Sequence, residues 1–152
     1  MRETRKSNIL PVLLYGAESW KITEGISQTL DIFQSKCLRR IYRIFWPNKI
    51  TNEDLLMRAG MEPVSTVVKR RRWKWLGHVC RMQPQALPKT ALRWTPQGQR
   101  RRGRPMETWR RTVEREMKGK GWTWGEVSKQ AQNRELWRSQ VSALCVTAHD
   151  RG

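Results

Sequence analysis

The stretch VSTVVKRRRWKWLGHVCRM, residues 64–82, decides the predicted fold of this chain. Its apolar residues recur at spacings of three and four, which places them along one side of a helix. These residues are Val64, Val67, Val68, Trp75, Leu76, Val79 and Met82. Pro63 stands just before them, where a proline is compatible with the first turn of a helix. We therefore predict a helix from Pro63 to about Met82.

The same helix contains a basic run, Lys69-Arg70-Arg71-Arg72-Trp73-Lys74. On a helix this run covers more than half a turn, so at least one of its cations must point toward the packed side or its rim. A buried cation is unfavourable unless an anion or a carboxylate receives it. The sequence therefore predicts such a partner for at least one of these side chains.

Two tryptophans of this helix have different predicted roles. Trp73 and Trp75 lie about 200° apart on a helix, so they do not both face one core. Trp75 is in register with Val68 and Val79 and is predicted to be buried. Trp73 then faces away from that core, and stacking on a base or under an arginine is one interpretation of it.

A second amphipathic helix is predicted upstream, over residues 24–45. Its apolar positions also follow spacings of three and four. They are Ile26, Leu30, Phe33, Cys37, Ile41 and Ile44, and the other side carries Lys36, Arg39, Arg40 and Arg43. Thr23 is suited to cap its start and Trp46-Pro47 to end it, because the residue before a proline resists the helical region. The apolar patch Ile9–Trp20 contains Pro11 near its start, so we expect its helix to begin upstream of Met1.

The remaining segments predict three shorter helices and one irregular stretch. Thr51 with Asp54 has the form of a capping box and opens a helix that ends at Gly60. Residues 83–105 lose the periodicity and read as an extended linker, with a short strand near Thr90–Trp94. Pro105 is expected at the first position of a helix that ends at Gly119 or Gly121. A second capping box, Thr123 to Glu126, opens the last helix, with Val127, Ala131, Trp137, Val141 and Leu144 facing inward.

Together these elements predict an all-α protein. A helical bundle is expected at residues 1–82, a basic linker rich in Pro, Gly and Arg at 83–104, and a small two-helix lobe at 105–152, whose end from 146 onward frays. The 152-residue length excludes a complete polymerase or a large multidomain enzyme.

The net charge of +18, from 31 basic and 13 acidic residues, predicts a polyanionic partner. Nucleic acid is favoured over an anionic membrane, because the basic residues come in blocks rather than opposite a single apolar face. The apolar run Ile9–Tyr15 is too short to span a bilayer, and no secretory cleavage pattern follows it. We therefore expect a nuclear or cytoplasmic protein, not a secreted one. The three cysteines, Cys37, Cys80 and Cys145, read as reduced core thiols.

The residues do not point to catalysis or to a bound cofactor. The sequence has no paired carboxylates of the kind that hold catalytic metal ions, no glycine-rich phosphate loop and no nucleophile elbow. Neither a metal nor a small-molecule substrate is expected, and zinc is disfavoured because the cysteines are not closely paired. His78 is interpreted as a half-buried helical side chain or as a contact to a phosphate or base.

The cluster Arg100-Arg101-Arg102-Gly103-Arg104-Pro105 allows three interpretations. Its Arg-Gly-Arg-Pro core is that of an AT-hook, which places arginines in a narrow minor groove. Glu107 follows closely, where a hook needs positive charge, so a loop that binds the phosphate backbone is preferred. The third interpretation is a solvated loop without a ligand.

Several strings occur together in one order. They are Pro11–Trp20 (PVLLYGAESW), Cys37–Ile41 (CLRRI), Arg72–Met82 (RWKWLGHVCRM), Arg101–Pro105 (RRGRP) followed by Trp109, and Ala131–Arg134 (AQNR) followed by Trp137. This order resembles the C-terminal thumb and post-thumb region of reverse transcriptases from LINE-type, non-LTR retrotransposons. In that family the polymerase aspartates and the endonuclease lie upstream. The resemblance thus implies a non-catalytic part of an RNA-directed DNA polymerase, and its start implies a truncated copy or a gene fragment.

The resemblance also implies partners. A thumb grips the template–primer duplex, so RNA, DNA or their hybrid is expected here, together with the upstream polymerase palm. The predicted nucleic-acid contacts are Arg39, Arg40, Arg43, Lys69, Arg70, Arg71, Arg72, Trp73, Lys74, His78, Arg81, Arg100, Arg101, Arg102 and Arg104. Two alternatives remain: a stand-alone DNA-binding protein that reads DNA through the arginine loop, and an inert pseudogene product.

Overall fold

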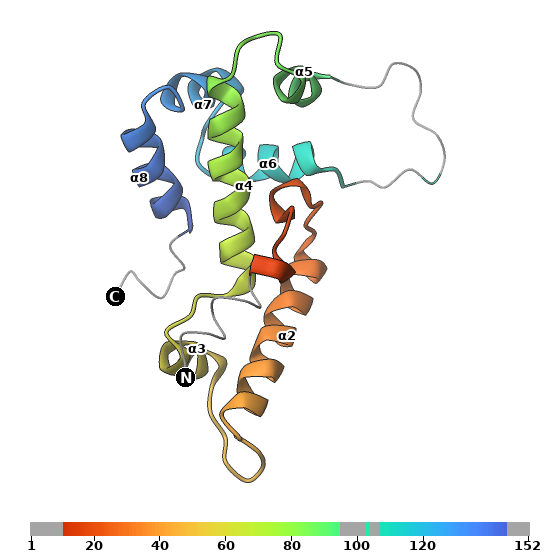
Figure 1. The fold of residues 1–152 in the computed structure, drawn as a ribbon, viewed down its shortest axis with the longest axis vertical. Helices are drawn as coiled ribbons and strands as arrows, with labels where there is room; N and C mark the ends of the chain where they lie inside the picture. Colours follow the sequence, from red (N-terminus) through yellow and green to blue (C-terminus); the bar gives the residue numbers. More distant parts are fainter. Residues whose placement is uncertain (1–10, 95–102, 104–106, 146–152) are drawn as a thin grey trace.

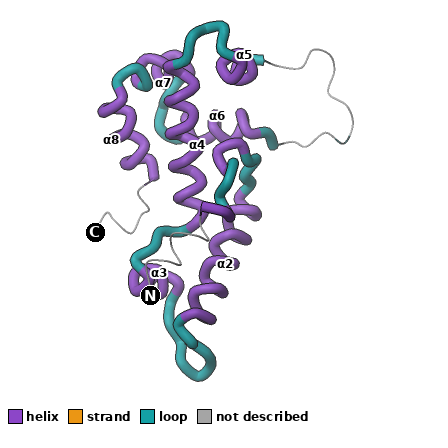
Figure 2. Tube along the Cα trace, viewed as in Figure 1, coloured by secondary structure: helices purple, strands orange, loops and turns teal. Residues whose placement is uncertain are grey.

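The computed structural model describes residues 11–94, 103 and 107–145. Within these residues the chain forms helices and no strand, which confirms the all-α prediction. The elements are η1 (Ala17–Ser19), α2 (Glu24–Ile41), α3 (Asn52–Ala59), α4 (Val64–Arg81), α5 (Leu87–Arg93), α6 (Trp109–Lys118), α7 (Trp124–Gln130) and α8 (Arg134–Cys145). Figure 1 shows α4 along the long axis, with α2 and α3 toward one end and α6 to α8 toward the other. Figure 2 traces the connections between these helices.

Helix α4 is the central element because its buried residues face two different neighbours. Val64 and Val68 pack with Leu14 of the N-terminal segment and Ala17 of η1. Farther along the helix, the buried residues Trp73, Leu76 and Cys80 belong to a second core with α6, α7 and α8. A single apolar stripe therefore does not describe α4, since it is covered over a much wider arc.

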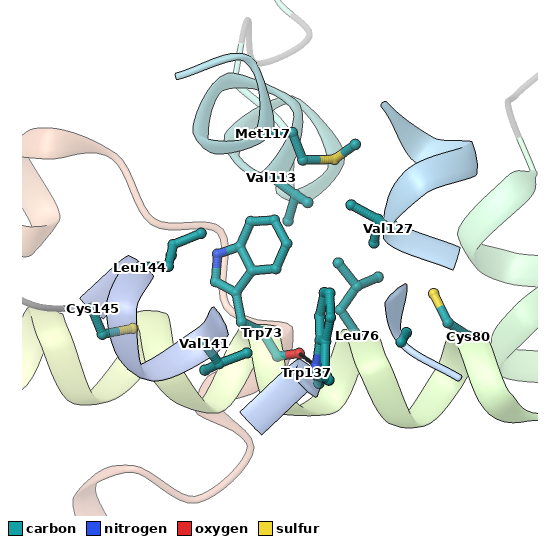
Figure 3. Packing of buried hydrophobic residues seen from close by; sticks show 11 residues of the cluster. Trp73, Leu76, Cys80, Val113, Met117, Val127, Trp137, Val141, Leu144 and Cys145 are labelled. Carbon is teal, nitrogen blue, oxygen red and sulfur yellow. Dashed lines mark hydrogen bonds between the residues drawn. The ribbon is translucent and has the colours of Figure 1, made fainter. Parts of the chain in front are cut away.

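The second core contains a cluster of tryptophans, of which Figure 3 shows Trp73 and Trp137. The Trp73 ring lies 5.8 Å, centroid to centroid, from both Trp122 and Trp137, and the Trp137 Nε1–H donates to the Trp73 carbonyl at 3.1 Å. Trp75 is only half-buried and meets the edge of Trp109. The prediction that Trp75 is the core residue and Trp73 the free one is wrong, because α6 to α8 cover the side of α4 that carries Trp73.

The second core contains residues from both the predicted bundle (1–82) and the predicted C-terminal lobe (105–152). Trp73 and Leu76, from the segment 1–82, share their core with Val113 and Val127, from the segment 105–152. Whether the two segments fold independently stays a prediction. In this structure α4 belongs to both.

Helix α2 packs through a polar side rather than through its apolar stripe. Leu38 is buried together with Gln34 and Ser35, whereas Phe33 is 51% exposed and Ile41 is 45% exposed. The prediction that these two residues face the core is therefore wrong, and Ile26 is likewise exposed.

The reason is that α2 caps the start of α4. The Gln34 Oε1 accepts the Val64 N–H at 2.9 Å, and the Asp31 carboxylate accepts the Ser65 N–H at 3.0 Å and the Ser65 hydroxyl at 2.6 Å. The first N–H groups of a helix have no partner within the helix. Because Pro63 has no side chain that can accept them, α2 supplies the acceptors.

Helix α2 also ends earlier than predicted, at Ile41 rather than near residue 45. Arg43 adopts a left-handed backbone with φ of 54°, the Arg43 N–H donates to the Arg40 carbonyl, and the Ile44 N–H donates to the Arg39 carbonyl. This pair of bonds is a Schellman motif, which normally has glycine at the left-handed position. An arginine there gives no sequence signal.

Three other expectations are wrong in detail. Residues Leu87–Arg93 form α5, so the strand expected near Thr90 is absent. Helix α6 begins at Trp109 behind the cap Thr108, so Pro105 is not its first residue. The last predicted helix is two helices, because α7 ends at Gln130 and the Asn133 side chain accepts the first N–H groups of α8.

The caps themselves are confirmed. The hydroxyls of Thr23, Thr51 and Thr123 each accept an N–H of the helix that they precede, and Thr123 with Glu126 forms a full capping box. Gly60 ends α3 in the left-handed conformation. None of the helices in the described part of the chain is long and apolar enough to cross a bilayer.

Candidate nucleic-acid interface

The solvent side of α4 carries a row of basic side chains. Arg70, Lys74, His78 and Arg81 follow one another at spacings of four, four and three, which keeps them on one side of the helix. Lys74 and His78 are exposed, and Arg70 and Arg81 are half-buried. This row, the α4 basic row, includes two members of the predicted basic run, Arg70 and Lys74.

Hydrogen bonds hold the two arginines of this row, Arg70 and Arg81, and the neighbouring Arg71. The Arg70 guanidinium donates to both oxygens of Glu62, at 2.5 and 2.8 Å. That bond holds the pKa of Glu62 below its ordinary value and raises the pKa of Arg70. Arg71 donates to the Leu14 carbonyl and Arg81 to the Ala131 carbonyl, both at 2.8 Å. These bonds position the guanidinium groups. Because each guanidinium has five N–H donors, each keeps further donors that these bonds do not use.

Arg72 is the cation that the sequence predicts to be buried with a partner. Its side chain is 2% exposed and its Nη2 donates to the Glu116 carboxylate of α6. The other oxygen of Glu116 accepts the Trp73 Nε1–H at 2.5 Å. Arg72 and Trp73 are therefore structural residues here, and the expectation that Trp73 stacks on a base does not fit its burial.

Three of the predicted basic contacts on this segment and its neighbour Lys36 lie near the end of α2: Lys36, Arg39 and Arg40 are within the helix, and Arg43 follows it. Lys36, Arg40 and Arg43 are exposed. Arg39 is half-buried, and its Nη2 donates to the Ile50 carbonyl at 3.0 Å. Arg39 thus ties the loop after α2 to the helix, and the other three remain available to a ligand.

Lys69 lies apart from the α4 basic row and lines a cleft of about 430 Å³ between the start of α2, α4 and α6. The charges lining this cleft balance: the cations are Lys69, Arg72 and Arg115, and the acids are Glu24, Asp31 and Glu116. A balanced lining does not attract a phosphate, so the cleft adds nothing to a polyanion site.

The arginine cluster at residues 100–104 falls largely outside the described residues, which include only Gly103 of it. Among the described residues, no group of three His, Cys, Asp or Glu side chains is placed to hold a metal ion. The three cysteines are free thiols. Cys80 and Cys145 are buried, which raises the pKa of each thiol, and Cys37 is half-buried.

The aromatic pair Phe45 and Trp46 escaped the sequence prediction. Trp46 is 86% exposed and Phe45 is 61% exposed, in the loop between α2 and α3. The dipeptide Trp46-Pro47 reads only as a helix stop, and a spacing argument gives no hint of where the ring points.

Comparison with known proteins gives a transposon connection. A transposon-derived protein of Caenorhabditis elegans is 26% identical to this chain over 116 residues, which are 73% of this chain and 42% of that protein. This chain thus spans well under half the length of its relative. No family model matches the chain, and no solved structure matches it. The similarity supports an origin in a transposon.

Proposed function

We propose that this chain binds nucleic acid without catalysing a reaction, as the thumb and post-thumb part of a LINE-type reverse transcriptase. Its ligand is the backbone of the template–primer or of the target, and its protein partner is the polymerase body that precedes a thumb. The observation that carries the proposal is the set of exposed basic side chains on α2, just after it and on α4, namely Lys36, Arg40, Arg43, Lys74 and His78.

Two further observations support it. The net charge of +18 is spread over a small body, which raises the local concentration of a polyanion. The relative from Caenorhabditis elegans is described as transposon-derived, and such elements encode proteins that handle nucleic acid. Backbone contact by lysine and arginine gives affinity without sequence readout.

The test is the salt dependence of binding. Replacing Lys36, Arg40 and Lys74 together with Ala should reduce the slope of log affinity against log salt on duplex DNA by about two to three, because each neutralised phosphate contributes about 0.9. Fluorescence anisotropy over a salt series measures both slopes.

The matched control removes the same charge from another surface. Lys118, Lys120 and Arg138 are exposed on α6, on the turn after it and on α8. Their replacement with Ala should change the slope by less than about one. Equal reductions for the two triple variants would show that only the overall charge matters, and absence of binding by the wild-type chain at low salt would end the proposal.

A further inference from the structure

The loop between α2 and α3 presents two aromatic rings to solvent. Trp46 is 86% exposed and Phe45 is 61% exposed, although burying such a ring is among the most favourable contacts available to a small protein. The loop lies at one end of the long axis of the molecule (Figure 1), so nothing else in the described chain covers it.

The two rings are exposed on a loop that packing and hydrogen bonds hold in place. The residues on either side of the tip are held: Ile44 and Ile50 pack against the small core of Leu38 and Leu55, and Arg39 donates to the Ile50 carbonyl. The Ile44 N–H also donates to the Arg39 carbonyl.

The tip itself is a tight turn. The Asn48 N–H donates to the Phe45 carbonyl at 2.9 Å, which makes Trp46 and Pro47 its central residues. Side chains at the centre of a turn point away from the chain that they reverse. The structure therefore directs the indole of Trp46 outward on a fixed support.

Cations flank the rings. Arg40 and Arg43 precede the tip and Lys49 follows it, and all three are exposed. Within the nearest chain, residues 40–50, no acidic residue occurs. A polyanion that also offers flat apolar faces matches this combination, and single-stranded nucleic acid is such a ligand, because its unpaired bases can stack on an aromatic ring while its phosphates meet the cations.

From this arrangement we infer that Trp46, supported by Phe45, is a stacking platform for an unpaired base of bound nucleic acid, with Arg40, Arg43 and Lys49 on the adjacent phosphates. The inference rests on the proposed function and narrows it to strands with unpaired bases, such as a single-stranded template or a frayed end. Duplex DNA, whose bases are already stacked, gains nothing from the ring.

The experiment compares a short oligothymidylate with a blunt duplex of the same length, using the full chain. Trp46→Ala should weaken binding of the single strand by about 5- to 150-fold, the range measured for one lost base stack, and change duplex affinity less than about twofold. The salt slope should stay unchanged, because no phosphate contact is removed. Trp46→Phe keeps an aromatic face and should restore most of the affinity.

Tyr15→Ala is the matched control, since Tyr15 is another aromatic residue and is 87% exposed outside this loop. If the wild-type chain binds both probes and Trp46→Ala behaves like Tyr15→Ala, the stacking platform is wrong and the proposed function stands. If the wild-type chain binds neither probe, the proposed function fails and the platform with it. Loss of binding to phosphatidylserine vesicles in Trp46→Ala, with single-strand affinity unchanged, would overturn the platform in favour of a membrane contact.

Discussion

Gly77 shows at the scale of one residue how the second core constrains the sequence. A Cβ built at Gly77 would lie 2.1 Å from the Trp137 Nε1, which itself donates to the Trp73 carbonyl. Glycine in the interior of a helix is normally unfavourable by about 1 kcal/mol relative to alanine. Here the absent side chain is what allows α8 to approach α4.

Gly77→Ala should therefore destabilise the protein, by about 1–3 kcal/mol, because the Trp137 ring must move out of its packing. Gly25→Ala is the control, since a Cβ at this exposed position of α2 meets no atom within 4 Å. That control should be neutral or stabilising by up to about 1 kcal/mol. Urea unfolding followed by circular dichroism measures both, and equal effects of the two substitutions would contradict the packing argument.

Glu116 is the residue that makes the buried Arg72 tolerable. Its carboxylate receives both the guanidinium and the indole N–H of Trp73, while two other nitrogens of Arg72 are buried without a protein partner. Removing the acid leaves an uncompensated cation in the interior.

Glu116→Ala should reduce the free energy of unfolding by about 3–5 kcal/mol, the range for breaking a buried pair from one side. Glu114→Ala breaks the pair with Arg110, in which both side chains are more than a third exposed, and should reduce it by about 1 kcal/mol or less. Denaturant midpoints distinguish the two. A double variant with Arg72→Met should regain part of the loss, and its failure to do so would mean that Glu116 acts through Trp73 instead.

At the scale of the element, α2 shows that apolar periodicity identifies a helix without saying which side is buried. The stripe through Ile26 and Phe33 is regular, yet the side that contacts the protein is the one carrying Asp31, Gln34 and Leu38. The start of α4 has N–H groups without a partner in its own helix, and the polar side of α2 supplies the acceptors. Leaving those buried N–H groups unsatisfied is more unfavourable than exposing a few methyl groups of the apolar stripe.

A pair of substitutions separates the two sides of α2. Leu38→Ala should destabilise the chain by about 2–5 kcal/mol, because Leu38 is 7% exposed, while Phe33→Ala should change stability by less than about 1 kcal/mol, because Phe33 is 51% exposed. Thermal and urea unfolding of both variants provide the measurement. The opposite order would mean that the apolar stripe is the packed side.

At the scale of the whole molecule, the cysteines report whether the second core is assembled. Cys80 from α4 and Cys145 from α8 are far apart in sequence and are buried in one cluster, whereas Cys37 of α2 is half-buried outside it. Burial disfavours the thiolate and so raises the pKa of both core thiols from the ordinary value of 9.0.

A thiol reagent at pH 8 should label Cys37 in the native protein, and label Cys80 and Cys145 only after unfolding, because the reactive species is the exposed thiolate. Mass spectrometry of the labelled chain checks this expectation. Uniform labelling of all three cysteines in the native state would mean that the second core is open.

The raised pKa of Cys80 and Cys145 has a second consequence. Below pH 9.0 the thiols keep their protons in both the folded and the unfolded state, and above it the unfolded state loses them first. The free energy of unfolding should therefore fall as the pH rises past 9.

Much of the architecture followed from the sequence, because the deciding interactions are local. The caps at Thr23, Thr51 and Thr123, the end of α3 at Gly60 and the inward positions of the last two helices depend on residues a few positions apart. The basic run also predicted a buried cation with an acidic partner, since a helix has no way to point six successive residues outward.

Tertiary structure alone decided which side of α2 and which side of α4 are used. The contacts that bury Trp73, and those that turn Phe33 toward solvent, join segments tens of residues apart, and no periodicity encodes which segments meet. The candidate site divides in the same way: the sequence named the cations, but only the packing of α4 against η1, α2 and α6 to α8 sorted them into structural and exposed. The physical reason is that a helix specifies its own hydrogen bonds, whereas burial is a property of the neighbour that covers it.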